Sequence, residues 1–184
     1  HVKRENIFQW YKGMRLTDVI SSVNDLLPRP DLSYALIVRE RPEDLSTGVI
    51  RINLRRAMEN RKSQDNALLK PDDELMIFNL DQPRSEQVEG LVESLEKQSS
   101  FMSPSQVVSI TGNVRFPGRY PLTQDMTLLE LFNAAYDVLG DSDVNYVACQ
   151  RQVYDAEKGH YKLVFESFDL TVTSPENIRL NSLD

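Results

Sequence analysis

An internal repeat constrains the fold of this chain more than any other feature of its sequence. When the chain is shifted by 112 positions, Met14 to Arg39 aligns with Met126 to Arg151 without a gap, and seven of the 26 pairs are identical. Composition alone would give roughly one or two identities over that length. The identical pairs are Met14/Met126, Leu16/Leu128, Asp25/Asp137, Leu27/Leu139, Asp31/Asp143, Tyr34/Tyr146 and Arg39/Arg151. The chain therefore carries two copies of one structural unit.

Each copy begins with a pattern that predicts a short helix. Apolar residues recur at positions i, i+3, i+4 and i+7, which places them on one face of a helix. In the second copy Thr127 and Glu130 have the spacing of a capping box at the helix start. The apolar stripes are Leu16, Val19, Ile20 and Val23 in the first copy and Leu128, Leu131, Phe132 and Ala135 in the second.

Strands are predicted after each helix. A loop rich in Pro, Gly and Asp comes first, at 28–31 and 140–143, and β-rich runs follow it. These runs are 34–39 and 49–54 in the first copy, and 146–151 and 161–165 in the second. The landmarks Asn53-Leu54 and Leu69 match Asp169-Leu170 and Leu180 with small gaps.

The two copies are expected to be incomplete at opposite ends. A turn and strand at 70–78 close the first copy, whereas the second stops at Asp184, before the equivalent strand. A strand and turn at 107–112 open the second copy, and their counterpart would precede His1. We expect strand addition or exchange between chains at the edges left unpaired.

The segment between the copies predicts a third helix. Its stripe of apolar residues again has helical spacing, with Ser85 as N-cap, Glu93 and Lys97 as an i,i+4 ion pair and Gly90 as a destabilising interior residue. The stripe is Val88, Leu91, Val92 and Leu95. The predicted fold class is α+β, with a first module at 1–82, a helical connector at 83–105 and a second module at 106–184.

Composition argues against several functions. The chain has 21 basic and 28 acidic residues, and residues 86–184 carry a net charge of -8 (7 basic, 15 acidic), so nucleic acid is not an expected partner. Cys149, His1 and His160 are too few for a zinc site, and no CxxC or HxxxH spacing occurs. We expect no metal, no cofactor and no enzymatic activity. No apolar run approaches the ~20 residues that span a bilayer.

Two segments resemble the SLBB domain, a soluble-ligand-binding β-grasp module, as found in Wza-type bacterial polysaccharide export proteins. The opening motif is matched by Gly112, Val114, Pro117, Gly118 and Tyr120, and the closing motif by Leu69, Pro71, Asp73, Leu75 and Ile77. The sequence departs from the family at Pro28, where Gly is usual. Gly112, Pro117, Gly118, Pro71 and Asp73 are expected to be structural residues.

This resemblance implies two β-grasp-like SLBB modules in the periplasmic portion of an outer-membrane polysaccharide (capsule or exopolysaccharide) exporter. Such proteins form ring-shaped homo-oligomers, and the expected partners are the polysaccharide, further copies of the chain and an inner-membrane polysaccharide co-polymerase. The implied location is the periplasm, and the implied role is subunit assembly and contact with polysaccharide or co-polymerase. The alternative is a soluble receptor module that binds a defined oligosaccharide in a pocket. A redox-complex SLBB module is disfavoured, because one cysteine cannot ligate a cluster.

The candidate binding residues are Arg115, Phe116, Arg119 and Tyr120, around the Pro117-Gly118 step. Aromatic faces stack on sugars, and guanidinium groups hold the carboxylates of acidic sugars. The competing interpretation is a solvated type II turn, with Pro117 and Gly118 at its centre, between ordinary strand residues.

Several other residues were weighed for structural and functional roles. Tyr34 and Tyr146 are expected in the core or on a sheet face, and Cys149 is expected to be a buried, unreactive thiol. The run Asp72-Asp73-Glu74 is expected to be a solvated turn in preference to a cation site.

Overall fold

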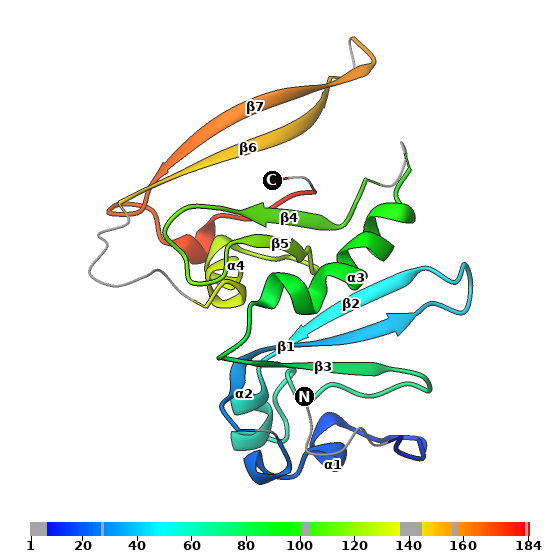
Figure 1. The fold of residues 1–184 in the computed structure, drawn as a ribbon. Coiled ribbons are helices and arrows are strands. Elements are labelled where there is room, and N and C mark those ends of the chain that lie inside the picture. The colour runs from blue at the N-terminus through cyan, green and yellow to red at the C-terminus, as the bar shows by residue number, and fades with distance from the viewer. Residues whose placement is uncertain (1–6, 27, 101–103, 137–144, 156–157, 183) are drawn as a thin grey trace. The chain divides into compact units, whose positions relative to one another are not determined.

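A computed structural model describes residues 7–26, 28–100, 104–136, 145–155, 158–182 and 184 (Figure 1). The described residues form antiparallel sheets with few helices, which agrees with the predicted α+β class. The chain divides into two compact units, one up to Pro83 and one from Arg84 onward. Asp137, Leu139 and the 140–143 loop of the repeat, together with Leu27, lie outside the described residues.

The first unit is a three-stranded sheet with three short helical segments. The sheet has the order β2-β1-β3, and β1 pairs antiparallel with both neighbours. Its elements are α1 (Leu16–Val19), the 3-10 helix η1 (Val23–Asp25), β1 (Pro30–Glu40), β2 (Thr47–Ile52), α2 (Leu54–Glu59) and β3 (Glu74–Asn79). One face of the sheet and the helices enclose a core that includes Leu16, Ile20, Ile37, Leu69 and Ile77.

The described part of the second unit contains one long helix, one short helix and two hairpins. β4 pairs with β5, and β6 pairs with β7 over their full lengths. The elements are α3 (Arg84–Lys97), β4 (Val107–Ile110), β5 (Gly118–Pro121), α4 (Leu128–Ala134), β6 (Tyr146–Asp155), β7 (His160–Asp169) and the 3-10 helix η2 (Pro175–Asn177). α3 packs against β4 and β5 through its buried residues Val88, Val92 and Leu95.

The first predicted helix is shorter than its stripe suggests. α1 ends after Val19, and Val23 lies exposed in η1, so its place in the helical stripe was wrong. Asp25 accepts hydrogen bonds from the backbone N–H groups of Ser21 and Ser22. Because such local bonds offer the backbone an alternative to the helix, they end α1 early.

Other element predictions also need correction. Ser85 lies inside α3, which begins at Arg84, so Ser85 is not the N-cap. The strand predicted for 49–54 ends at Ile52 because the Asn53 side chain accepts a hydrogen bond from the Arg56 N–H and starts α2, a helix that was not predicted. The capping box of Thr127 and Glu130 is present.

The two copies of the repeat make the same backbone hydrogen bonds. The Leu16 N–H donates to the Ala67 carbonyl at 3.0 Å, and the Leu128 N–H donates to the Ile178 carbonyl at 2.8 Å. Likewise Leu69 N–H bonds Met14 O, and Leu180 N–H bonds Met126 O, both at 2.9 Å. Every donor and acceptor in the second copy lies 112 or 111 residues after its counterpart in the first. The sequence repeat therefore corresponds to a structural repeat.

The ion pairs repeat as well. Arg39 meets Asp73 with an N–O distance of 2.6 Å, and Arg151 meets Asp184 at 3.2 Å. Each Arg also donates a hydrogen bond to a carbonyl in the segment before its Asp: Arg39 to Leu68, and Arg151 to Arg179. The identity of Arg39 and Arg151 in the sequence repeat therefore has a structural reason.

Gly118 does not occupy the centre of a type II turn. It is the first residue of β5, opposite Ile110, and residues 111–117 form the connection. Its φ of +155° differs from the roughly +80° of that turn position, so the tight-turn prediction for Pro117-Gly118 was wrong. A Cβ at Gly118 would lie 2.9 Å from the Ser85 Cβ, which shows that glycine allows α3 to approach β5 closely.

Replacing Gly118 with Ala is expected to lower the free energy of unfolding by about 2 kcal/mol, because the methyl group overlaps Ser85 and the backbone has positive φ. The matched control is Gly90→Ala in the exposed interior of α3, where nothing lies within 4 Å. That control should gain up to about 1 kcal/mol. Urea unfolding measures both, and an unchanged Gly118→Ala midpoint would contradict the close approach.

Candidate functional site

The structure separates the four candidate residues at 115–120. Arg115 and Arg119 are exposed, Phe116 is half-buried and Tyr120 is fully buried. Arg119 and Tyr120 are adjacent in β5, and neighbouring strand residues point to opposite faces. The four side chains therefore do not form one binding surface.

Arg115 and Phe116 belong to a cluster of two cations and two rings. The guanidinium carbon of Arg115 lies 4.8 Å from the ring centroid of Tyr136 and 5.4 Å from that of Phe116. Arg84 lies 5.4 Å from the Phe116 centroid and 5.7 Å from that of Tyr136. The Phe116 ring is thus occupied by protein cations, which favour the faces of aromatic rings.

Arg84 caps the C-terminal end of α4, a role that was not predicted from the sequence. Its Nη1 donates to the carbonyl oxygen of Asn133 at 2.9 Å and to that of Ala134. A cation at this position satisfies the terminal carbonyls of the helix and complements its dipole. Burial lowers the pKa of Arg84 to about 10, so at neutral pH the group remains charged.

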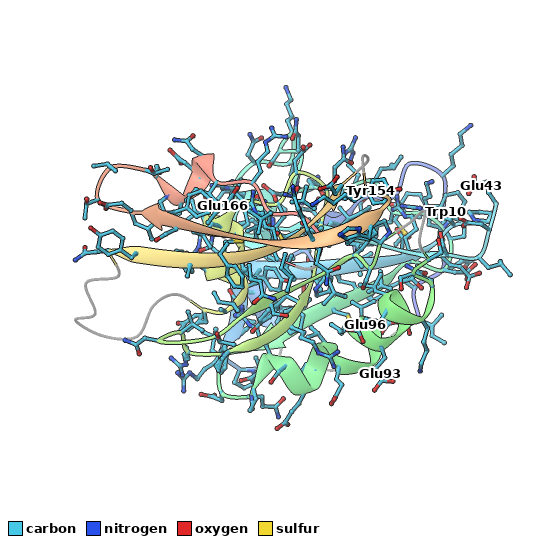
Figure 2. All side chains as sticks on the ribbon, turned by 90° about the horizontal axis from the view of Figure 1, so that it is seen from above. Trp10, Glu43, Glu93, Glu96, Tyr154 and Glu166 are labelled. Atoms are coloured by element: carbon cyan, nitrogen blue, oxygen red, sulfur yellow. The ribbon has the colours of Figure 1, made fainter. Side chains whose placement is uncertain are left out.

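Arg119 and Tyr120 each have structural partners. Arg119 pairs with Glu96 of α3 at 2.7 Å, and about half of each side chain is exposed. Figure 2 shows Glu93 and Glu96 on α3, where Glu93 forms the predicted ion pair with Lys97 at 3.3 Å. The Tyr120 hydroxyl donates to the Phe116 carbonyl at 2.6 Å, so Tyr120 holds the 111–117 connection onto β5 from inside the core.

Two of the predicted structural residues, Gly112 and Asp73, make defined local contacts. Gly112 has a φ of +98°, and its carbonyl accepts from the Val114 N–H. In the turn after Pro71, the Asp73 carboxylate accepts from the Lys70 N–H and from two nitrogens of Arg39. Asp73 is thereby committed to an ion pair, and its side chain is only 4% exposed. The expectation of a solvated turn therefore holds for Asp72 and Glu74, which are exposed, but was wrong for Asp73.

Cys149 lies beside the ion-paired group of Arg151, Glu166 and Asp184 in the second unit. Among the described residues, no three His, Cys, Asp or Glu side chains converge in a way that could hold a metal. Cys149 is half-buried, so the prediction of full burial was wrong, because its strand β6 is covered less completely than β1. Burial raises the pKa of the Cys149 thiol. His160 is exposed at the start of β7.

The exposed face of the β6–β7 hairpin carries aromatic and aliphatic side chains. Alternate residues of each strand point to this face, and they include Gln150 and Gln152 as well as large apolar residues. Phe165 is 72% exposed and Tyr146 is 67% exposed, and Figure 2 labels Tyr154 on the same hairpin. We call this set the hairpin face, and its apolar members are Tyr146, Tyr154, Tyr161, Leu163 and Phe165.

The hairpin face could have been found from the sequence. Tyr146, Ala148, Gln150, Gln152 and Tyr154 alternate along one strand with a period of two. The two tyrosines of the repeat were expected in the core or on a sheet face, and Tyr34 lies in the core whereas Tyr146 lies on the exposed sheet face. Tyr154 and Tyr161 meet edge to face, with ring centroids 5.3 Å apart. Aromatic rings interspersed with amide groups offer both stacking surfaces and hydrogen-bond donors.

A pocket of about 580 Å³, with both polar and apolar walls, lies beside one edge of the hairpin face. Tyr161 and Gln152 of the hairpin contribute to it, together with side chains from the end of α3 and from residues 181–182. The other lining residues are Glu96, Ser99, Ser100, Pro104, Ser105, Asn181 and Ser182. Hydroxyl and amide groups around one aromatic ring suit a polyhydroxylated ligand.

Comparisons of the chain with protein-family models, with curated proteins and with solved structures found no match. Over the described ranges, every helix falls short of the length and apolar character that crossing a membrane requires.

Proposed function

We propose that this chain is a non-enzymatic portion of a bacterial polysaccharide exporter, built from two SLBB-type β-grasp modules joined by a helical connector. On this proposal it acts in the periplasm, mediates assembly of homo-oligomers at the outer membrane, and contacts polysaccharide or an inner-membrane co-polymerase. The sequence motifs support the type of module. The exposed hairpin face is the structural observation that supports contact with a polymer.

The hairpin face supports contact with a polymer for three reasons. Its rings are exposed and spread along a strand pair, which suits an extended ligand better than an enclosed site does. Aromatic faces stack on the C–H surfaces of sugar rings, and the amides of Gln150 and Gln152 can bond sugar hydroxyls. Large exposed apolar groups gathered on one face also mark interaction surfaces in general.

The charge of the second half restricts the class of polymer. Residues 86–184 carry a net charge of -8, so they repel a polyanion at low ionic strength. A neutral polysaccharide is therefore expected to bind the hairpin face better than an acidic one. Arg115 and Arg119 do not offset this charge as free binding groups, because Arg119 pairs with Glu96 and Arg115 lies over two rings.

Replacing Tyr154 or Phe165 with Ala is expected to weaken binding of a neutral glucan about tenfold, since each change removes an exposed stacking surface. Affinity electrophoresis in gels containing dextran measures the effect, and gels containing alginate provide the acidic comparison. Val172→Ala, which removes a side chain that is 80% exposed and lies outside the hairpin face, is the control. Equal retardation of all three variants and the parent chain would refute sugar contact at this face.

The alternative is a soluble oligosaccharide receptor, which the pocket beside the hairpin face favours. This function requires saturable binding of short oligosaccharides, and Gln152→Ala, at the pocket wall, should weaken it. Calorimetry separates the two functions, because a receptor binds a short oligosaccharide with micromolar affinity whereas an exporter surface requires longer polymer. Binding of polymer alone would exclude the receptor.

A further inference from the structure

A groove of about 930 Å³ lies in the second unit between β4 and β6. β4 and the 111–114 segment form one wall, and residues 146–150 of β6 form the other. Side chains of α4 and the residues Ile178, Leu180 and Asp184 complete the lining. β6 has β7 along one edge, and in the described part of the chain no strand pairs with its other edge, which borders the groove.

The structural repeat identifies what occupies the equivalent place in the first unit. β1, the counterpart of β6, pairs with β2 along one edge and with β3 along the other. β2 corresponds to β7, because both follow their partner strand across a turn. The open edge of β6 therefore corresponds to the edge of β1 that β3 covers.

The side chains that line the groove match those that β3 covers. In the first unit the inward residues of β3, Leu75 and Ile77, pack in the core with Leu16, Ile20, Ile37 and Leu69. The last four of these residues have counterparts in the second copy, at an offset of 112 for Leu16, Ile20 and Ile37 and of 111 for Leu69. The counterparts are Leu128, Phe132, Cys149 and Leu180. All four counterparts line the groove.

A tyrosine distinguishes the two copies on the other face of the sheet. Phe78 of β3 stacks on Tyr34, with ring centroids 5.4 Å apart, and both rings are buried. Tyr146 is the counterpart of Tyr34, yet it is 67% exposed and lines the groove. A ring that one copy buries under β3 is therefore uncovered in the other copy.

Asp184 marks the point at which a strand would enter. In the first unit Asp73 holds Arg39, and β3 begins at the next residue, Glu74. In the second unit Asp184 holds Arg151, and the Asp184 carbonyl accepts a hydrogen bond from the Ser109 N–H of β4 at 2.9 Å. The backbone at Asp184 thus already makes one bond of a ladder to β4.

We propose that this groove is a strand-acceptor site. It binds an extended segment with the alternating apolar pattern of β3, which enters beside Asp184, runs antiparallel to β6 and lies between β6 and β4. The driving forces are backbone hydrogen bonds to the strand edges and burial of two apolar side chains against α4. The inference does not rest on the proposed function, since it is argued from the internal repeat, the open edge of β6 and the lining of the groove.

Cys149 provides the test, because it is the only cysteine and it lines the groove. The β3 sequence Glu-Leu-Met-Ile-Phe-Asn is appended directly after Asp184 of the full chain, and the rate of maleimide labelling is compared with that of the parent chain. We expect labelling at least about tenfold slower, because the thiol then reacts only when the strand detaches. Hydrogen exchange should also slow at the amides of residues 107–110 and 147–150.

The matched control carries Asn at the two inward positions of the appended segment, which keeps its length and charge. Its labelling rate should equal that of the parent chain. If both extensions leave Cys149 as reactive as in the parent, the proposal is overturned. If the parent's own labelling slows as protein concentration rises, a second copy covers the groove, as expected for unpaired edges, and a segment entering beside Asp184 is overturned as its occupant. Should the extended chain fail to fold, the β3 peptide is added to the parent chain and the same readout applies.

Discussion

Replacing Arg39 with Met is expected to lower the free energy of unfolding of the first unit by about 3 kcal/mol. Two nitrogens of Arg39 bond the two carboxylate oxygens of Asp73 at 2.7 and 2.6 Å, and the Asp73 side chain is only 4% exposed. The variant leaves that carboxylate buried without its cation, and removes the hydrogen bond to the Leu68 carbonyl. Urea unfolding followed by circular dichroism measures the loss.

Two further variants separate the buried charge from other effects. Adding Asp73→Asn to the Arg39→Met chain removes the stranded charge while keeping an acceptor for the Lys70 N–H, so part of the lost stability should return. Arg29→Met breaks the exposed pair of Arg29 with Asp81 and should cost less than about 0.5 kcal/mol. A loss as small as this for Arg39→Met would show that its pair behaves like a surface contact.

In each unit the repeated ion pair joins a turn to the central strand of the sheet or hairpin. Asp73 and Asp184 each follow a turn closed by a local bond, from the Asp73 N–H to Lys70 and from the Asp184 N–H to Asn181. The carboxylate then ties this turn to an Arg on the central strand, β1 or β6. The pair therefore fixes where a following strand can join the sheet, as β3 does in the first unit.

Local sequence signals predicted the elements whose determinants lie within a few residues. The capping box of Thr127 and Glu130 needs only a spacing of three, and the pair of Glu93 with Lys97 needs a spacing of four. The repeat extended this reach, because identical residues 112 positions apart imply the same environment. Arg39 and Arg151 meet that expectation, since both bind an Asp and a carbonyl.

Features that depend on distant packing were not predicted. The need for glycine at position 118 arises from Ser85, which lies 33 residues earlier on α3 (118 − 85). Arg84 caps the end of α4 almost 50 residues later, and no local pattern marks it. The repeat also misled at Cys149, because its counterpart Ile37 is covered by β3 whereas Cys149 lines an open groove.

The candidate binding site was predicted from residue type, but the alternation of side chains along β5 places its members on opposite faces. Arg and aromatic residues at 115–120 suit sugar recognition as a set, but adjacent residues of β5 cannot all point to one surface. Tyr120 was consequently assigned to binding although it lies in the core. The hairpin face, which alternation does place on one surface, was overlooked.

Replacing Tyr120 with Ala is expected to lower the free energy of unfolding of the second unit by about 4 kcal/mol, comparable with other buried aromatic residues. Tyr120→Phe keeps the ring and removes only the hydrogen bond to the Phe116 carbonyl, so it should cost about 1 kcal/mol. Urea unfolding measures both. A ligand-facing Tyr120 would give the reverse pattern, with stability near that of the parent chain in both variants and binding lost.

Alkaline pH tests the same burial independently. Burial raises the pKa of Tyr120 from 10.0 to about 12, although Arg84 opposes the shift. The folded state therefore keeps the phenol proton where the unfolded state loses it, and this contribution to stability is present below pH 10 and disappears as the pH rises to about 12.

Arg84 acts in the opposite direction, since its lowered pKa favours the folded state as the pH rises above about 10. Both the parent chain and Tyr120→Phe contain Arg84, so the Arg84 contribution largely cancels when their free energies of unfolding are subtracted. The remaining difference should shrink between pH 10 and 12. A constant difference over that range would mean that the phenol is solvated in the folded protein.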